Sequence, residues 1–325
     1  MDAGDLAVFA AVARAGAMSQ AARTLHTVQS NVTQRIRLLE AELGVSLFHR
    51  RSRGVVLTSA GEQLLPYAER IGRLIDEARR AVTNGPVPRG QIMIGALETA
   101  TAVRLPPVLS IYAAACPEVD IQIQTGTAAE LTEAVLACRL ELVFVPGPVT
   151  HSDLLAVPVL EEELVIATAP WVTSLAALTV PAVMTKIICF RPGCSYRARL
   201  EALLRARGHI SIRRLEFGTL DGIIGCVGAG MGITMLPRTA VARAEAEGRV
   251  FLHALPADEA RVDIVMVRRH DTFLSTALTR FIEVARQHLA VQGEMRHAGR
   301  RLAAPAACLS TVTGSSGRRA RVRTK

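Results

Sequence analysis

The chain has few aromatic side chains and no cysteine pattern. Aromatic residues make up only 4% of the 325 residues, too few for a surface that stacks single-stranded nucleic-acid bases. The six cysteines form no CxxC pair and show no ligand-like spacing to histidine, which argues against a disulfide framework or a zinc site and fits a reducing cytoplasm. Half of the residues are hydrophobic, so the chain can bury real cores, and its length suits two or three compact units.

Neither an export signal nor a membrane span is expected. Asp2 and Asp5 occupy the region where a signal peptide needs positive charge, and Arg14 interrupts the apolar run that follows. The longest uncharged stretch, residues 164–185, contains two prolines and five hydroxyl side chains. That composition favours a strand, a loop and a second strand over a spanning helix. We therefore expect a cytoplasmic protein that contacts no membrane.

Charge is distributed unevenly along the chain. Residues 1–60 hold seven Arg and four acidic residues, residues 88–290 are close to neutral, and residues 291–325 hold eight Lys or Arg and one Glu. A basic N-terminal segment suits nucleic acid, whereas the neutral body does not. Residues 291–325 lack an apolar period and are predicted to be a basic, disordered tail that either adds salt-dependent, non-specific DNA affinity or has no function.

The first 60 residues predict three short helices. Apolar residues at helical spacing from Leu6 to Ala13 mark the first helix, and Gly16 ends it. The second helix carries the small pair Ala21-Ala22, which allows another helix to approach closely. The third helix ends at Gly44, and its predicted core face is Val32, Ile36, Leu39 and Leu43.

The other face of the third helix carries hydroxyl, amide and guanidinium groups, with no carboxylate before Glu40. An ordinary solvated helix face would alternate Glu with Lys or Arg. This inventory instead suits a DNA major groove, where amides pair with adenine and Arg with guanine. The predicted DNA-contacting residues of the two helices are Ser19, Gln29, Ser30, Asn31, Thr33, Gln34 and Arg37.

A basic turn follows the third helix. Two short apolar segments within residues 47–58 flank this turn, which contains Gly54. The pattern predicts a two-stranded wing that places Arg50, Arg51 and Arg53 against the phosphate backbone or the minor groove.

These motifs together resemble the winged helix-turn-helix of the LysR-type transcriptional regulators. The resemblance rests on Ala21-Ala22, Leu25, Gln29, Val32, Ile36, Leu39-Glu40, Leu43-Gly44, Leu47-Phe48, Arg50, Leu57-Thr58 and Gly61. One departure is Val28, where the family often has Ser; it removes one possible phosphate contact. Residues 1–58 are accordingly assigned as the DNA-binding domain.

Residues 59–83 predict a long linker helix. Ser59 and Glu62 form a candidate capping box. A heptad seam follows, made of Leu64, Ala68, Ile71, Ile75, Ala78 and Val82. The helix either packs on its own domain or pairs with the same helix of a second copy; the position of the seam beside a DNA module favours a dimer. The resemblance also implies dimerisation here and tetramers through the effector domains. Residues 84–90 have the composition of a hinge.

Residues 91–290 alternate between predicted strands and helices, ending in a strand at 262–267 and a helix at 272–289. The alternation predicts an open, largely parallel α/β sheet that binds ligands at the carboxyl ends of its strands. The resemblance implies an effector domain of two lobes, similar to periplasmic binding proteins. On that basis lobe one comprises about 90–162 plus 268–290, and lobe two comprises 163–267.

Hydroxyls and a helix start follow several of these strands, and such groups favour a small organic anion. Each is also an ordinary cap or turn residue when taken alone, and Arg197 faces either a ligand carboxylate or Glu201. The candidate effector-binding residues are Thr99, Thr101, Gly126, Thr127, Pro146, Cys194, Ser195, Arg197, Gly218 and Thr219.

No catalytic constellation is evident, and no cofactor or metal is expected. Ser195 lies in Cys-Ser-Tyr rather than in a Gly-x-Ser-x-Gly elbow. The sequence predicts a sequence-specific DNA-binding regulator that responds to a small effector. Two alternatives stay open. One is a redox-sensing regulator using Cys194, whose helix start and neighbouring arginines lower a thiol pKa, although the next cysteine is as distant as Cys226. The other is a plain small-molecule binding protein.

Overall fold

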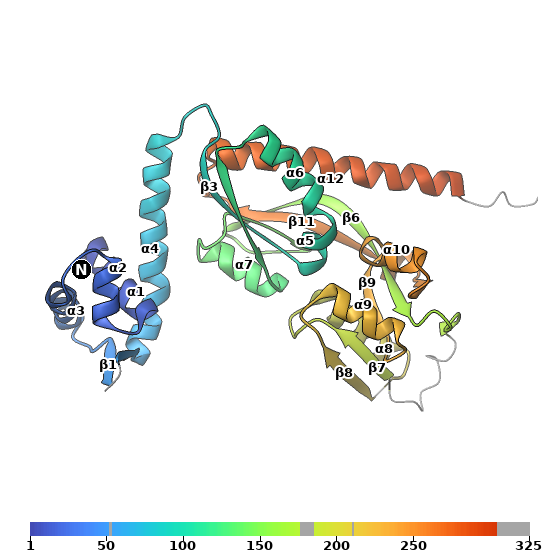
Figure 1. The fold of residues 1–325 in the computed structure, drawn as a ribbon, viewed down its shortest axis with the longest axis horizontal. Coiled ribbons are helices and arrows are strands. Elements are labelled where there is room, and N and C mark those ends of the chain that lie inside the picture. The colour runs from blue at the N-terminus through green and yellow to red at the C-terminus, as the bar shows by residue number, and fades with distance from the viewer. Residues whose placement is uncertain (52–53, 176–184, 210, 304–325) are drawn as a thin grey trace, which may run out of the picture.

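The computed structural model describes residues 1–51, 54–175, 185–209 and 211–303. Arg53 of the predicted wing and residues 304–325 of the predicted tail lie outside the described residues, as does the side chain of Arg50. Figure 1 shows a small N-terminal domain, a long helix beside it, and a larger α/β part of two lobes.

The N-terminal domain is a winged helix-turn-helix, as the apolar periodicity predicts. Its elements are α1 (Ala3–Ala15), α2 (Met18–Thr24), α3 (Gln29–Leu43), β1 (Phe48–Arg51) and β2 (Gly54–Leu57). The predicted core residues Val32, Ile36 and Leu39 are buried, and Phe9 packs on Phe48 with ring centroids 5.3 Å apart. Leu43 is the exception: it is the last residue of α3 and is 37% exposed.

The linker helix α4 (Ser59–Thr83) has the predicted bounds, but Ser59 is not its N-cap. The N-cap is Thr58, whose Oγ1 accepts a hydrogen bond from the Gly61 amide at 3.1 Å and donates one to the Ser46 carbonyl at 2.7 Å. Thr58 thereby caps the helix and ties it to the wing, which Ser59 does not do. A Cβ atom on Gly61 would lie 2.3 Å from the Leu47 carbonyl oxygen, so this contact requires glycine.

The predicted seam of α4 is divided between two environments. Leu64, Ala68 and Ile71 pack into the core of their own winged domain, and Ala68 is only 2% exposed. This half of the seam therefore packs on its own domain, the first of the two alternatives, with Ala68 covered by α1 and the wing. In the other half, Ala78 is exposed and Val82 is 89% exposed, so the described chain leaves this half open.

The C-terminal end of α4 is bonded to the larger part of the molecule. Arg80 donates to Glu141 at 3.0 Å, and the Asn84 side-chain oxygen accepts bonds from the amide and hydroxyl of Thr276, both at 3.1 Å. Burial raises the pKa of Glu141, and the bonds from the Met93 amide and Arg80 oppose that rise. One end of α4 is thus packed on the winged domain and the other is attached to lobe one.

Lobe one contains a mixed sheet in the order β4-β3-β5-β11-β6. Its strands are β3 (Gly90–Ala96), β4 (Val119–Thr125), β5 (Leu142–Pro146), β6 (Leu154–Thr168) and β11 (Arg261–Arg269). β3 runs parallel to β4 and β5, whereas β11 is antiparallel to both of its neighbours. The prediction of a largely parallel sheet is thus wrong for the pairs β5–β11 and β11–β6. The chain passes through lobe two before β11 and then returns to the lobe-one sheet in the opposite direction.

Helices cover both faces of the lobe-one sheet. These helices are α5 (Glu98–Val103), α6 (Leu105–Ala115), α7 (Ala128–Leu136) and α12 (Thr276–Ala303). α6 and α12 pack on one face around Ile92 and Ile94, and α7 packs on the other against Val143. Tyr112 of α6 donates to the Ala277 carbonyl at 2.9 Å, which joins the two helices of the first face (Figure 1).

Lobe two is built on the second half of β6. The remaining elements are β7 (Thr185–Cys189), α8 (Ser195–Ala206), β8 (Ile212–Glu216), α9 (Leu220–Gly228), β9 (Thr234–Pro237), α10 (Arg238–Ala246), β10 (Phe251–Ala254) and α11 (Ala257–Ala260). β9 and β10 pair with β6 from Leu164 to Thr168, whereas β11 pairs with β6 from Leu154 to Glu163. Residues 261–267, predicted in lobe two, therefore belong to lobe one, because β11 forms its ladder in that sheet.

The last helix differs from its prediction at both ends. Ser275 Oγ accepts a hydrogen bond from the Leu278 amide at 3.1 Å, so α12 begins at Thr276 rather than at residue 272. It continues to Ala303, so the prediction of disorder is wrong for residues 291–303. This segment holds three Arg, two Ala, one Gln and one Glu, which favour helix, and its first following proline is Pro305. None of the described helices has the length and apolar character needed to span a bilayer.

Candidate functional site

The first candidate site is the exposed face of α3. Gln29, Ser30, Asn31, Gln34 and Arg37 are all exposed there, as is Ser19 of α2. Thr33 is half-buried and donates to the Gln29 carbonyl at 2.9 Å, so its hydroxyl is partly used within the helix. The predicted polar face thus exists as one continuous surface, with Arg51 exposed on the adjacent wing.

Internal bonds keep acidic groups away from this face. Glu40, the first acidic residue of α3, accepts hydrogen bonds from the amides of Leu47 at 2.7 Å and Phe48 at 3.2 Å. Arg35 pairs with Asp5 of α1 at 2.7 Å. Glu40 and Asp5 therefore help to fix the angle of α3 against the wing and the first helix, and their carboxylates are engaged inside the domain.

The wing is pinned to the turn between α1 and α2. The Val55 amide donates to the Gly16 carbonyl at 2.8 Å. A Cβ atom on Gly54 would lie only 2.4 Å from that same oxygen, and Gly54 has a φ of 133°, so only glycine fits there. These contacts set the position of Arg51 relative to α3.

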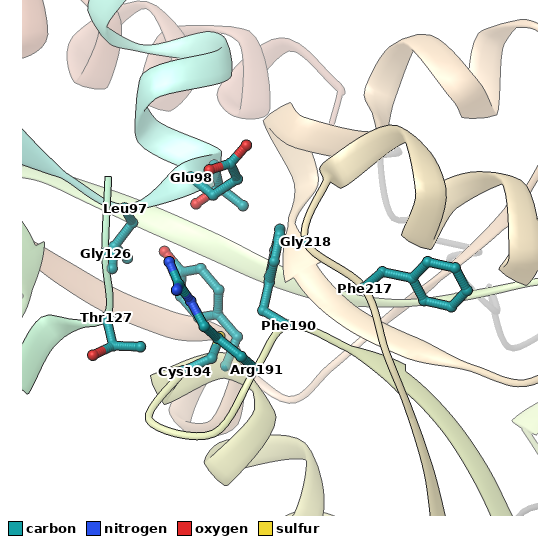
Figure 2. Close-up of a pocket in the computed structure, with 11 residues that line it drawn as sticks. Leu97, Glu98, Gly126, Thr127, Phe190, Arg191, Cys194, Phe217 and Gly218 are labelled. Carbon is teal, nitrogen blue, oxygen red and sulfur yellow. The ribbon is translucent and has the colours of Figure 1, made fainter. Parts of the chain in front are cut away.

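The second candidate site is a cavity of about 340 Å³ between the two lobes. Figure 2 shows its walls. Lobe one contributes the segment after β3 and the β4–α7 loop, and lobe two contributes the segments after β7 and β8. The lining residues are Leu97, Glu98, Thr99, Gly126, Thr127, Phe190, Arg191, Cys194, Tyr196, Phe217 and Gly218.

Five of the ten predicted effector residues line this cavity: Thr99, Gly126, Thr127, Cys194 and Gly218. The other five do not. Thr101 donates to the Leu97 carbonyl at 3.0 Å within α5, and Pro146 pairs with Ile264 in the sheet. The Ser195 hydroxyl is buried away from the cavity, and Thr219 caps α9 by accepting from the Gly222 amide.

Arg197 is the fifth, and it belongs to an ion-pair network rather than to the cleft. It donates to Glu201 at 3.0 Å, the i+4 alternative, and to Glu216 at 2.7 Å. Arg214 and Arg205 also donate to Glu201. The hydrogen bond from Arg214, followed by that from Arg197, holds the pKa of Glu201 at about 2.

The Glu201 network predicts a specific pH dependence of stability. Because the folded pKa lies below the ordinary value of 4.5, the charged carboxylate stabilises the fold above pH 4.5, and this contribution is lost as the pH falls towards 2. Glu201→Gln should therefore lower the urea midpoint at neutral pH, and the difference from the unchanged protein should shrink steadily below pH 4.5. An equal difference at every pH would contradict the assignment.

The charged and aromatic cavity residues were missed in the sequence because hydroxyls were favoured as ligand groups. Phe190 and Arg191 directly follow β7, and Glu98 comes two residues after β3, next to the chosen Thr99. Their positions after strands were therefore as indicative of a ligand site as those of the threonines. In Figure 2 the Arg191 side chain extends from the loop after β7 towards the wall that carries Glu98, while the ring of Phe217 points away.

The two lobes approach closely at the floor of the cavity. Gly193 of lobe two has a φ of 92°, and a Cβ atom there would lie 3.1 Å from the Thr127 side chain of lobe one. Thr127 forms a capping box with Glu130 at the start of α7. Thr127 is thus a helix cap, the alternative role given for these residues in the sequence, and it also lines the cavity.

Cys194 lies at the start of α8 in the cavity wall. Burial raises the pKa of its thiol, although the amides of Arg197 and Tyr196 and the charge of Arg197 act in the other direction. Burial likewise raises the pKa of the neighbouring Cys189 thiol to about 11. Both thiols are protonated at neutral pH, which disfavours the redox alternative, since the thiolate is the reactive form.

The molecule thus joins a winged helix-turn-helix, whose third helix presents an exposed polar face, to a two-lobed domain with a cavity between the lobes. This combination is typical of DNA-binding regulators that carry a separate two-lobed domain. The comparisons with known proteins specify it further. A family profile described as "LysR substrate binding domain" matches residues 86–290, and one described as "Bacterial regulatory helix-turn-helix protein, lysR family" matches residues 4–62. The chain belongs to the LysR family of transcriptional regulators.

Individual relatives agree with this assignment. The chain is 40% identical over 287 residues to "HTH-type transcriptional regulator GltR" of Bacillus subtilis, covering 88% of this chain and 97% of the relative. It is similar to full-length CbnR solved with its target DNA, with 26% identity, a TM-score of 0.62, and coverage of 89% and 100%. Full-length OxyR of Pseudomonas aeruginosa shares the fold at 19% identity, with a TM-score of 0.66 and coverage of 89% and 94%.

Proposed function

We propose that this LysR-type regulator reads promoter DNA as a homodimer and that a small organic effector bound between its lobes changes that binding. The observation that carries the proposal is the inter-lobe cavity, whose wall is shared by both lobes. A ligand that contacts both walls binds the closed arrangement better than the open one, and only such a difference can shift a conformational equilibrium. The effector in this proposal carries a carboxylate, because the Arg191 guanidinium and the hydroxyls of Thr99 and Thr127 can donate hydrogen bonds to it.

The DNA-contacting residues divide into two groups in the proposal. Gln29, Ser30, Asn31 and Gln34 near the start of α3 read base edges, and Arg37 and the wing arginines bind phosphates. The exposure of the α3 side chains and of Arg51 supports this division. CbnR, a relative of the same fold, was solved on its target DNA, which supports DNA contact through the corresponding domain.

The division of roles predicts different outcomes for Gln34→Ala and Arg51→Ala. Gln34→Ala should change the preferred bases at one position of the half-site and cost about 1–3 kcal/mol there. Arg51→Ala should weaken all sites alike and reduce the salt dependence of binding by about one phosphate contact. Binding to a randomised site library at several salt concentrations measures both effects. Identical site preferences and salt slopes in the two variants would contradict the division.

A redox-sensing function is the second candidate, but its supporting feature is weakened by the burial of Cys194. Peroxide treatment should leave the DNA affinity of the protein and of Cys194→Ser equally unchanged. A peroxide response that Cys194→Ser abolishes would favour the redox function over the effector function.

A further inference from the structure

Glu98 and Arg191 are charged residues on opposite walls of the inter-lobe cavity. Glu98 opens α5 in lobe one, and Arg191 follows β7 in lobe two. Within the described ranges, neither side chain takes part in a hydrogen bond or an ion pair. Figure 2 shows the two residues on opposite walls of the cavity, with the Arg191 side chain extending towards the lobe-one wall. Two opposite charges therefore border one binding space, and each still has its hydrogen-bonding capacity.

Roles within the fold do not use up these two charges. A Glu in the first turn of a helix interacts favourably with the helix dipole, but α5 has only six residues and none of its described amides donates to Glu98. Arg191 lies close enough to Glu130 to lower the pKa of that carboxyl, but the bonds that Glu130 makes with the amide and hydroxyl of Thr127 are the larger causes. Glu130 is thus held by Thr127 in the α7 capping box.

The charge of the ligand follows from this pair. A simple anion would be attracted by Arg191 but would bury the Glu98 carboxylate without a partner when the lobes close around it. A simple cation would pair with Glu98 but would leave the exposed Arg191 guanidinium bonded only to water. Removing one partner of a buried charge pair is strongly unfavourable. A ligand with one negative and one positive group satisfies both walls at once.

The rest of the cavity sets a size and a polarity. Leu97, Phe190 and Tyr196 give it apolar surface, and the Thr99 and Thr127 side chains add hydroxyls. A volume of about 340 Å³ is at the small end of ligand pockets. Such a space suits a short molecule with a compact apolar side chain rather than a nucleotide or a large planar ring.

We propose that the effector is a zwitterion of the α-amino-acid class, with its carboxylate on Arg191 and its ammonium group on Glu98. This inference rests on the proposed function, since it concerns the same cavity. It narrows the ligand from an organic anion to a molecule that must also carry a positive charge. In this arrangement the ligand itself joins lobe one to lobe two through two charge-assisted contacts.

The experiment uses the full-length protein and the twenty common amino acids in a thermal-shift screen, followed by calorimetry. For the amino acid with the largest shift, two analogues are compared: the carboxylic acid that lacks the amino group and the amine that lacks the carboxylate. We expect the amino acid alone to stabilise the protein, in proportion to the logarithm of its concentration. Glu98→Gln and Arg191→Gln should each weaken its affinity about tenfold or more.

Glu133→Gln is the matched control, because Glu133 is exposed on α7 and does not line the cavity; it should keep the affinity of the unchanged protein. Equal binding of the amino-free acid, with no effect of Glu98→Gln, would overturn the zwitterion while keeping an effector in the cleft. The absence of any shift with all twenty amino acids would also overturn it. Failure of the proposed function is seen separately, as failure to bind promoter DNA or as DNA binding that no cleft ligand alters.

Discussion

Replacing Glu162 by glutamine is expected to lower the free energy of unfolding by about 3–5 kcal/mol. Glu162 lies on β6 where the strand passes from lobe one to lobe two. Its carboxylate accepts two parallel hydrogen bonds from Arg104, at 2.6 and 2.9 Å, and a third from the Thr239 hydroxyl at 3.3 Å. The side chains of Glu162 and Arg104 are 4% and 9% exposed. Glutamine keeps the shape of Glu162 but removes the negative charge that faces the buried Arg104 guanidinium.

Urea denaturation of the full chain measures this effect. The double variant Arg104→Met with Glu162→Leu is the matched comparison, because it removes both charges together; replacing a buried pair by apolar residues is often close to neutral. The single variant should therefore be much less stable than the double variant. A loss below about 1 kcal/mol in Glu162→Gln would indicate that water reaches the pair, as it does in exposed ion pairs.

Val82→Asp is expected to weaken self-association about 100-fold, since it places an unpaired charge in an apolar helix–helix contact. Val82 is 89% exposed in the single chain, at the end of the open half of the α4 seam beyond Ile75 and Ala78. Because it has almost no contacts within its own chain, the substitution should leave the monomer fold unchanged. Sedimentation velocity across a concentration series measures the association, and thermal melting verifies the fold.

Thr83→Asp is the control for this variant. It adds the same charge in the same last turn of α4, one residue and therefore about 100° away from the seam. Its oligomeric state should match that of the unchanged protein. Unchanged mass in Val82→Asp as well would show that the chains associate through another surface, and loss of association in both variants would point to damage to the helix end.

The architecture could be predicted because its signals are local. Core periodicity of α3, the basic turn around Gly54 and the alternation of strands with helices each depend on neighbouring residues, and the structure confirms them. The placement of β11 could not be derived in this way. Its apolar residues read as a strand in either lobe, and only the long-range pairing of Val262 with Glu162 decides the sheet.

The cleft was predicted in outline but not in chemistry. The ends of the strands were located correctly, so Thr99, Gly126 and Gly218 were found. Arg197 was wrongly assigned to the cleft because a side chain in the first turn of a helix can point in several directions. Its partner Glu216 lies on β8, which the sequence near Arg197 does not reveal. Glu98 and Arg191 are 93 positions apart in the chain. Only the folded arrangement of the two lobes shows that both line the same cavity.

The attachment of α4 at both of its ends makes the helix a lever arm. Its lower half moves with the winged domain because Leu64 and Ala68 are packed into that core, and its upper end follows lobe one through Arg80 and Asn84. Twenty-five residues of α-helix span about 37 Å. A tilt of about 5° at the upper end then displaces the DNA-reading end by about 3 Å, close to the 3.4 Å rise of one base pair. In the proposed function, a rotation of lobe one by this amount is enough to bring the two α3 helices of a dimer into or out of register with successive major grooves.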